Sequence, residues 1–251
     1  MAAYHFICLN YEHDDEIIMI GYSRGAFAVR CIINMINEIG LLSRRGLANL
    51  HPVFDCWWNN KTRRELDAEL THLGPGDWQP CGGHETHFIK VCGLWDTVNS
   101  VGQAGIFGPG SPLGIKRGST PSRVTAAPMS GVENVFHALS LHERRSLFQP
   151  EIANVVDHDT QKLEQCWFSG YHGDIGGGRP DDMLAHLSLT WMMGKLHPFI
   201  DFDNSIFYQG EMIPLNRRIH LESTGELLIC LSLAMHTGAD RLRLGDRTVA
   251  I

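Results

Sequence analysis

A chain of 251 residues with 43% hydrophobic and 20% charged residues can bury one sizeable core, which excludes a disordered or fibrous protein. Its formal net charge of −7, with scattered lysines and arginines, excludes a basic surface, so we expect no nucleic-acid partner. Without an apolar stretch of roughly 18 residues, a secretory signal or paired cysteines, the sequence predicts a cytoplasmic protein without a transmembrane segment.

The first part of the chain predicts helices and a buried strand in alternation. Residues 2–11 favour a short helix, and Glu16–Ile20 is a short β-branched run typical of a buried strand. The segment Arg24–Ile39 is apolar on nearly every face and is followed by Gly40, a residue typical of helix C-termini. We therefore expect a central helix there, and a further helix over 61–72.

The rest of the chain continues this alternation. Residues 86–95 predict a second strong strand, and the dense Gly, Pro and Ser of 102–122 predict a long surface loop that could act as a lid. After it we expect, in chain order, a helix over 132–147, a strand over 163–168, a glycine-rich loop over 171–180 and a helix over 183–196. The pattern predicts a single α/β domain over 1–251, with a mostly parallel sheet flanked by helices, in which residues 196–251 form a C-terminal extension without a readable chemical signal.

A G-x-S-x-G motif, Gly21-Tyr22-Ser23-Arg24-Gly25, lies between the first predicted strand and the central predicted helix. This is the setting of a nucleophile elbow, in which a serine occupies a strained turn that small flanking residues permit. The backbone N–H of Arg24, at the helix N-terminus, would then stabilise an oxyanion. The alternative is a tight turn whose glycines serve packing alone; the flanking strand and helix favour Ser23 as a nucleophile.

A serine nucleophile requires a base, and the base requires an orienting carboxylate. Asp96 follows the second strong strand, at the sheet edge where α/β proteins gather catalytic groups, although an aspartate there also commonly caps a turn. His172 lies in the glycine-rich loop after the third predicted strand, and it is one of 14 histidines. His137 and His142 are the alternatives for the base. The chain order Ser, Asp, His is the one that this kind of hydrolase uses.

Four motifs occur in order along residues 1–195: GYSRGAF, GLWDTV, FHALSLHERR and WFSGYHGDIGGG. Together they resemble the motifs of the α/β-hydrolase-like family DUF2235, which includes phospholipase effectors of bacterial type VI secretion and many fungal proteins. The resemblance implies Ser23 as nucleophile, Asp96 as acid and His172 as base, with a loop-ordering role for Asp174. It also implies a lipid or phospholipid ester as substrate, and the mechanism needs neither a metal nor an organic cofactor.

The chain departs from the family pattern in two places. A family motif that ends in Asp-Glu-Arg-Arg reads His142-Glu143-Arg144-Arg145 here. Family members also have, before the elbow, a first strand that ends in Asp-Gly-Thr, and this chain begins after that segment. We therefore expect a truncated sheet without its first strand and an oxyanion hole without the donor from that loop, a loss that typically costs about 100 to 1,000-fold in turnover.

Two smaller groups of residues are better explained by structural roles than by binding. Cys81, His84 and His87 carry metal-binding side chains, but no fourth ligand accompanies them at a diagnostic spacing, so we expect no metal site. Phe54 and the pair Trp57-Trp58 could line an acyl pocket, but large aromatic side chains are usually buried by packing, and we expect them in the core.

Two functions are consistent with these residues. The first is a serine hydrolase that cleaves carboxylic esters, with lipid or phospholipid esters as the substrate class implied by the resemblance. The second is a catalytically impaired or non-catalytic paralogue that acts as an interaction module. The complete Ser-Asp-His set favours the first, and the absent first strand favours the second.

Overall fold

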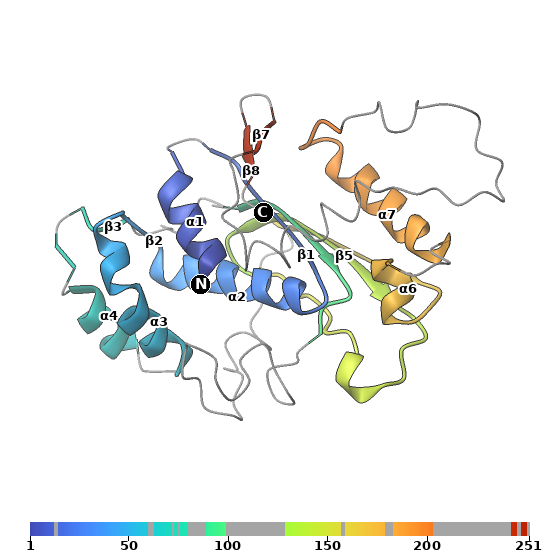
Figure 1. Ribbon diagram of the computed structural model, residues 1–251, viewed down its shortest axis with the longest axis horizontal. Coiled ribbons are helices and arrows are strands. Elements are labelled where there is room, and N and C mark those ends of the chain that lie inside the picture. Colours follow the sequence, from blue (N-terminus) through green and yellow to red (C-terminus); the bar gives the residue numbers. More distant parts are fainter. Residues whose placement is uncertain are drawn as a thin grey trace.

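Four parallel strands form the central sheet, in the order β1 (Ile17–Tyr22), β4 (Ile89–Trp95), β5 (Val132–Ser140) and β6 (Lys162–Phe168). Figure 1 shows this sheet with helices on its two faces, which confirms the predicted α/β class. The computed structural model describes residues 1–12, 15–59, 63–71, 73–74, 76–79, 89–98, 129–156, 159–178, 183–202, 242–244 and 247–249.

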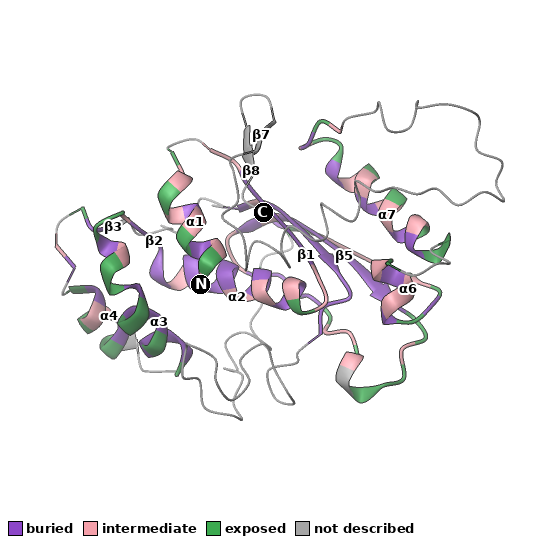
Figure 2. Cartoon of the chain, viewed as in Figure 1, coloured by how far each residue is buried: buried purple, intermediate pink, exposed green. Residues whose placement is uncertain are grey.

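Both faces of the sheet are covered. The helices α1 (Ala2–Asn10) and α2 (Arg24–Ile39) share one core with Ile17 and Met19 of β1. The alternate residues Ile18 and Ile20 pack in a second core with α7 (Met183–Leu196). Because successive strand residues point to opposite faces, this division explains why β1 is apolar at every position rather than alternately. Figure 2 shows the resulting buried strands between the helices.

A smaller helical region follows α2. It contains α3 (Leu50–Trp58), α4 (Arg63–Thr71) and the short antiparallel pair β2 (Leu41–Leu42) and β3 (Trp78–Gln79). Phe54, Trp57 and Trp58 are buried here, as the sequence predicted, with the Phe54 and Trp58 rings stacked 5.6 Å apart. The remaining described elements are the short helix α6 (His172–Gly176), the 3-10 helices Gly46–Asn49 and Ser146–Phe148, and the antiparallel pair β7 (Leu242–Leu244) and β8 (Arg247–Val249).

The predicted helix over 132–147 is wrong, because this segment contains strand β5, followed by a loop and a 3-10 helix. Apolar residues at 132, 135, 136 and 139 fit a helical period, but β5 lies between two neighbouring strands and is covered on both faces. A strand in this position is apolar almost throughout, so its pattern does not differ from that of a buried helix.

Most other elements agree with the sequence prediction. The helices over 24–39 and 183–196 have the predicted bounds, and β1, β4 and β6 occupy the three predicted strand regions. The glycine-rich segment 171–180 is not entirely a loop, since it begins with the short helix α6 (His172–Gly176). The predicted loop over 102–122 and the residues Cys81, His84 and His87 lie outside the described residues. Within the described part of the chain, no helix is long and apolar enough to cross a membrane.

Candidate active site

Ser23 occupies the single-residue turn between β1 and α2. Its φ of 58° and ψ of −121° lie in a region that residues other than glycine rarely adopt, at a typical cost of about 1–3 kcal/mol. Its backbone N–H donates to the carbonyl of Trp95 at 2.8 Å, which ties the turn to β4. A Cβ on Gly21 would lie 2.7 Å from the Cα of Ala26, so only glycine lets strand and helix meet this closely. This geometry is that of the predicted elbow.

Asp96 follows the next strand of the sheet and is 0% exposed. The backbone N–H of Ser140 donates to its Oδ1 at 2.7 Å, and the Ser140 hydroxyl donates to its Oδ2 at 2.8 Å. The N–H of Asp96 itself donates to the carbonyl of Ala138 at 2.8 Å. Main chain and side chain are thus both fixed by the end of β5, which leaves Oδ2 directed at one further partner.

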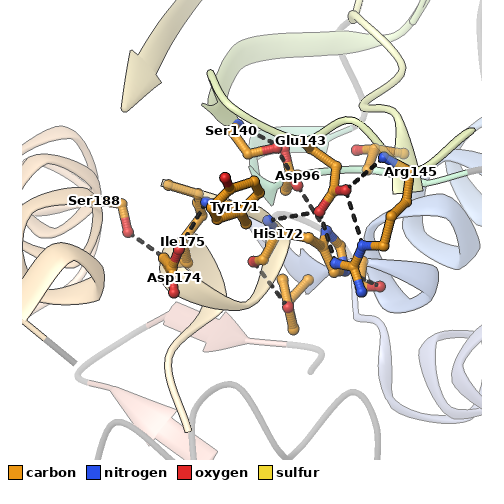
Figure 3. A network of polar contacts seen from close by, with 12 residues as sticks. Asp96, Ser140, Glu143, Arg145, Tyr171, His172, Asp174, Ile175 and Ser188 are labelled. Atoms are coloured by element: carbon orange, nitrogen blue, oxygen red, sulfur yellow. Dashed lines mark hydrogen bonds and ion pairs between the residues drawn. The ribbon is translucent and has the colours of Figure 1, made fainter. Parts of the chain in front are cut away.

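That partner is His172, the first residue of α6. Its Nδ1 lies 2.6 Å from Oδ2 of Asp96, and its Nε2 lies 2.8 Å from Oγ of Ser23. Figure 3 shows the histidine between Asp96 and the residues of the α6 turn. The structure therefore brings the three residues singled out in the sequence into one hydrogen-bonded series. In the sequence, Ser23 lies 149 residues and Asp96 lies 76 residues before His172. Such a chain can take a proton from a hydroxyl and return it.

Two aromatic rings enclose the imidazole of His172. The Tyr22 ring stacks on it at 4.9 Å and an interplanar angle of 23°, and the Phe148 ring lies 5.2 Å away, tilted by 52°. The Tyr22 hydroxyl also donates to the carbonyl of His172 at 3.1 Å. Gly176 makes this packing possible, because a Cβ there would collide with the Tyr22 ring. Sequence reasoning missed both aromatic contacts, although Tyr22 stands within the motif itself.

Asp174 closes the turn that carries His172. Its Oδ2 accepts the backbone N–H of Tyr171 at 2.8 Å, and its own N–H donates to the Tyr171 carbonyl at 2.8 Å. This reciprocal pair fixes the first turn of α6 around the histidine. The contacts are those that a loop-ordering residue would make, the role that the resemblance implied.

The two alternative histidines have other partners. His137, in β5, is fully buried, and its Nε2 accepts the backbone N–H of Thr97 at 3.3 Å. Burial, together with the nearby Arg30, lowers the pKa of His137 to about 3, so that this imidazole stays neutral. His142 accepts the backbone N–H of Gly170 on Nδ1 at 3.0 Å. These bonds give both histidines structural partners, whereas the imidazole that lies within hydrogen-bond distance of the Ser23 hydroxyl is that of His172.

The backbone N–H of Arg24 is the donor that the structure offers next to Ser23. Arg24 is the first residue of α2, and the first N–H groups of an α-helix have no acceptor within the helix. They also lie at the positive end of the helix dipole, which favours a negative charge. The arrangement can therefore stabilise an oxyanion that forms beside the serine.

Comparison with known proteins supplies the family. A family model described as "T6SS, Phospholipase effector Tle1-like, catalytic domain" matches residues 1–195. The uncharacterized protein YEL023C of Saccharomyces cerevisiae is 32% identical over 152 residues, which are 59% of this chain and 20% of that protein. A solved structure, the Tle1 effector bound to the VgrG spike of the type 6 secretion system, is similar at 21% identity and a TM-score of 0.33, over 66% of this chain and 26% of the effector. The chain thus spans about a fifth to a quarter of the length of these relatives.

Proposed function

The chain belongs to the family of the Tle1-like phospholipase effector catalytic domain, and we propose that it is a serine hydrolase that cleaves carboxylic esters of lipids. The observation that carries this proposal is the hydrogen-bonded chain from Ser23 through His172 to Asp96, with the serine at a strained elbow. The family description names phospholipases, which supports lipid or phospholipid esters as the substrate class.

In the proposed reaction, Oγ of Ser23 attacks the carbonyl carbon of the ester while Nε2 of His172 accepts the hydroxyl proton. The Asp96 carboxylate holds the Nδ1–H tautomer and stabilises the imidazolium that forms. The N–H of Arg24 donates to the oxyanion of the tetrahedral intermediate. His172 then passes the proton to the leaving alcohol, and a water molecule, deprotonated by the same imidazole, hydrolyses the acyl-enzyme. This reaction scheme uses neither a metal nor an organic cofactor.

Hydrolysis of a short p-nitrophenyl ester and of a phospholipid by the full chain tests this proposal, with Ser23→Ala as the decisive variant. We expect Ser23→Ala to lower kcat by at least about 1,000-fold, because no other group supplies the attacking oxygen. Ser146→Ala, which removes an exposed hydroxyl from the nearby 3-10 helix, is the matched control and should retain wild-type activity. Equal activity of Ser23→Ala and wild type would contradict the proposal. A folded wild-type chain without esterase activity would favour the interaction module instead.

A cytoplasmic location is part of the same proposal. The described cysteines are free thiols: Cys8, Cys31, Cys56, Cys92 and Cys166. Unpaired cysteines are typical of proteins in a reducing compartment. Fractionation of cells that express the tagged full-length protein tests this location, and recovery in a secreted or organellar fraction would contradict it.

A further inference from the structure

Glu143, in the loop after β5, holds the main chain of His172. Its Oε2 accepts the backbone N–H of His172 at 3.2 Å, while the Tyr22 hydroxyl donates to the carbonyl of the same residue at 3.1 Å. The Glu143 side chain is 0% exposed, so this contact is shielded from competing water. Both polar main-chain groups of the histidine are therefore bound by side chains from other parts of the chain.

Arg145 fixes the Glu143 carboxylate in turn. Its Nε donates to Oε1 at 2.9 Å and its Nη2 to Oε2 at 2.7 Å, and the backbone N–H of Arg145 adds a third bond to Oε1 at 2.8 Å (Figure 3). A two-pronged pair of this kind sets the orientation of a carboxylate as well as its charge. The Arg145 side chain lowers the pKa of Glu143 to about 2, so the carboxylate is ionised near neutral pH.

The same guanidinium reaches the histidine by a second route. Its carbon atom lies 4.1 Å from the centre of the Phe148 ring, and the Phe148 ring lies 5.2 Å from the imidazole of His172. The pair formed by Glu143 and Arg145 therefore contacts the histidine at its backbone N–H and, through Phe148, at one face of its ring.

Glycines flank His172 on both sides, so contacts from outside its loop restrict its conformation beyond what the Asp174 bonds do. Gly170 has a φ of 120°, Gly173 follows the histidine directly, and Gly177 has a φ of 77°. Residues of this kind allow many backbone conformations, and only some of them leave Nε2 within hydrogen-bond distance of Ser23.

We propose that Glu143 is a positioning residue that, with Arg145 and Phe148, keeps the imidazole of His172 aimed at Ser23. This inference rests on the proposed function, in which His172 is the base. Glu143 does not touch the reacting atoms; it limits the conformations of the residue that does. Its removal should therefore slow the proton transfer without weakening the binding of substrate.

Steady-state hydrolysis by the full chain tests this role with Glu143→Ala and Glu143→Gln. We expect Glu143→Ala to lower kcat by about 10 to 100-fold with little change in KM, because a displaced base affects the chemical step. Glu143→Gln keeps an oxygen that can accept a hydrogen bond from the His172 N–H but loses the charged pair with Arg145. Its kcat should therefore lie between those of the wild type and Glu143→Ala. The matched control is Arg144→Ala, an exposed neighbour in the same loop, which should behave as wild type.

A second readout does not depend on turnover. The proton on Nδ1 of His172, held by Asp96, should give a low-field proton NMR signal in the wild type and in Arg144→Ala. In Glu143→Ala this signal should weaken through exchange with water while the melting temperature shows that the protein is folded. If Glu143→Ala does not fold, Glu143→Gln decides: a reduced kcat supports the positioning role.

Wild-type kcat and an unchanged signal in a folded Glu143 variant would overturn the inference alone. An inactive wild type whose His172 signal still depends on Glu143 would instead overturn the proposed function and leave the positioning role standing.

Discussion

Two carboxylates bind the same histidine, one at its ring and one at its main chain, and their surroundings differ. Asp96 is completely buried at the ends of β4 and β5, where it binds the imidazole Nδ1 of His172. Glu143 lies in a surface loop, paired with Arg145, whose side chain is 54% exposed, and it binds the backbone N–H of the histidine. The carboxylate that binds the imidazole ring thus lies at the end of a strand of the sheet, while the carboxylate that we propose positions the histidine lies in a loop.

This difference separates the consequences of losing each carboxylate. In the proposed mechanism, a change at Asp96 alters which nitrogen of His172 carries the proton, whereas a change at Glu143 alters only where the ring lies. Substitution of Asp96 should therefore lower kcat more than substitution of Glu143, and a neutral side chain of similar shape at Asp96 should not restore it.

The largest effect is expected for Asp96→Asn. This substitution keeps the volume of the side chain but replaces an acceptor with an amide that favours the wrong tautomer of His172, so kcat should fall by about 1,000 to 10,000-fold. Ester hydrolysis together with the melting temperature measures this. A loss of less than about tenfold in a folded Asp96→Asn protein would show that the carboxylate does not act on the imidazole.

A smaller loss is expected for Ser140→Ala. The substitution removes the hydroxyl that donates to Oδ2 of Asp96 but leaves the backbone N–H on Oδ1. Because one acceptor of a buried carboxylate then has fewer donors, we expect the free energy of unfolding to fall by about 1–3 kcal/mol, with a moderate loss of kcat. Urea unfolding and ester hydrolysis of Ser140→Ala and of the exposed control Ser146→Ala provide the measurement. Equal values for the two variants would contradict the assigned contact.

The burial of His137 predicts that the free energy of unfolding decreases in acid. Its pKa is about 3 in the folded protein against 6.5 in an ordinary histidine, so the unfolded chain binds a proton first as the pH falls. The stability contribution of a neutral His137 is complete above about pH 6.5 and is lost progressively toward about pH 3. In His137→Asn, the free energy of unfolding should depend less steeply on pH across this window. Parallel curves for the variant and wild type would show that His137 titrates normally.

The ion pair of Glu143 predicts a smaller change in the free energy of unfolding, over a more acidic pH range. Its pKa is about 2 in the folded protein against an ordinary value of 4.5, so its contribution is present above about pH 4.5 and is lost as the pH falls toward about 2. Urea unfolding of wild type and Glu143→Gln should give curves that approach each other below about pH 4.5 and run parallel above it. A difference between the two proteins that stays constant from neutral pH down to about pH 2 would contradict this assignment.

Local signals in the sequence predicted one half of the site. The elbow could be predicted because the strand, the motif and the helix are adjacent in the sequence. The bounds of α2 and α7 were predicted correctly because their apolar patterns and flanking residues are local as well. Asp96 and His172 could be selected because each follows a predicted strand. The fold class followed from the same alternation of strands and helices.

Contacts between distant residues could not be predicted in the same way. Ser140 binds Asp96 across 44 residues, and its position at the end of a strand was hidden because β5, covered on both faces, has the pattern of a buried helix. Glu143 lies 29 residues before the histidine whose N–H it binds, and nothing in the spacing of the two residues points to that bond. The residues that surround the imidazole depend on the packing of the whole sheet rather than on any single motif.

The measurement that tests the central claim most directly is covalent labelling of the full chain with a fluorophosphonate probe, followed by mass spectrometry of its peptides. Such probes react with a serine hydroxyl that a neighbouring base activates. We predict one adduct, on Ser23, that is absent from Ser23→Ala and forms more slowly in Glu143→Ala. An adduct on a different serine, or labelling that persists in Ser23→Ala, would contradict the assignment of Ser23 as the nucleophile.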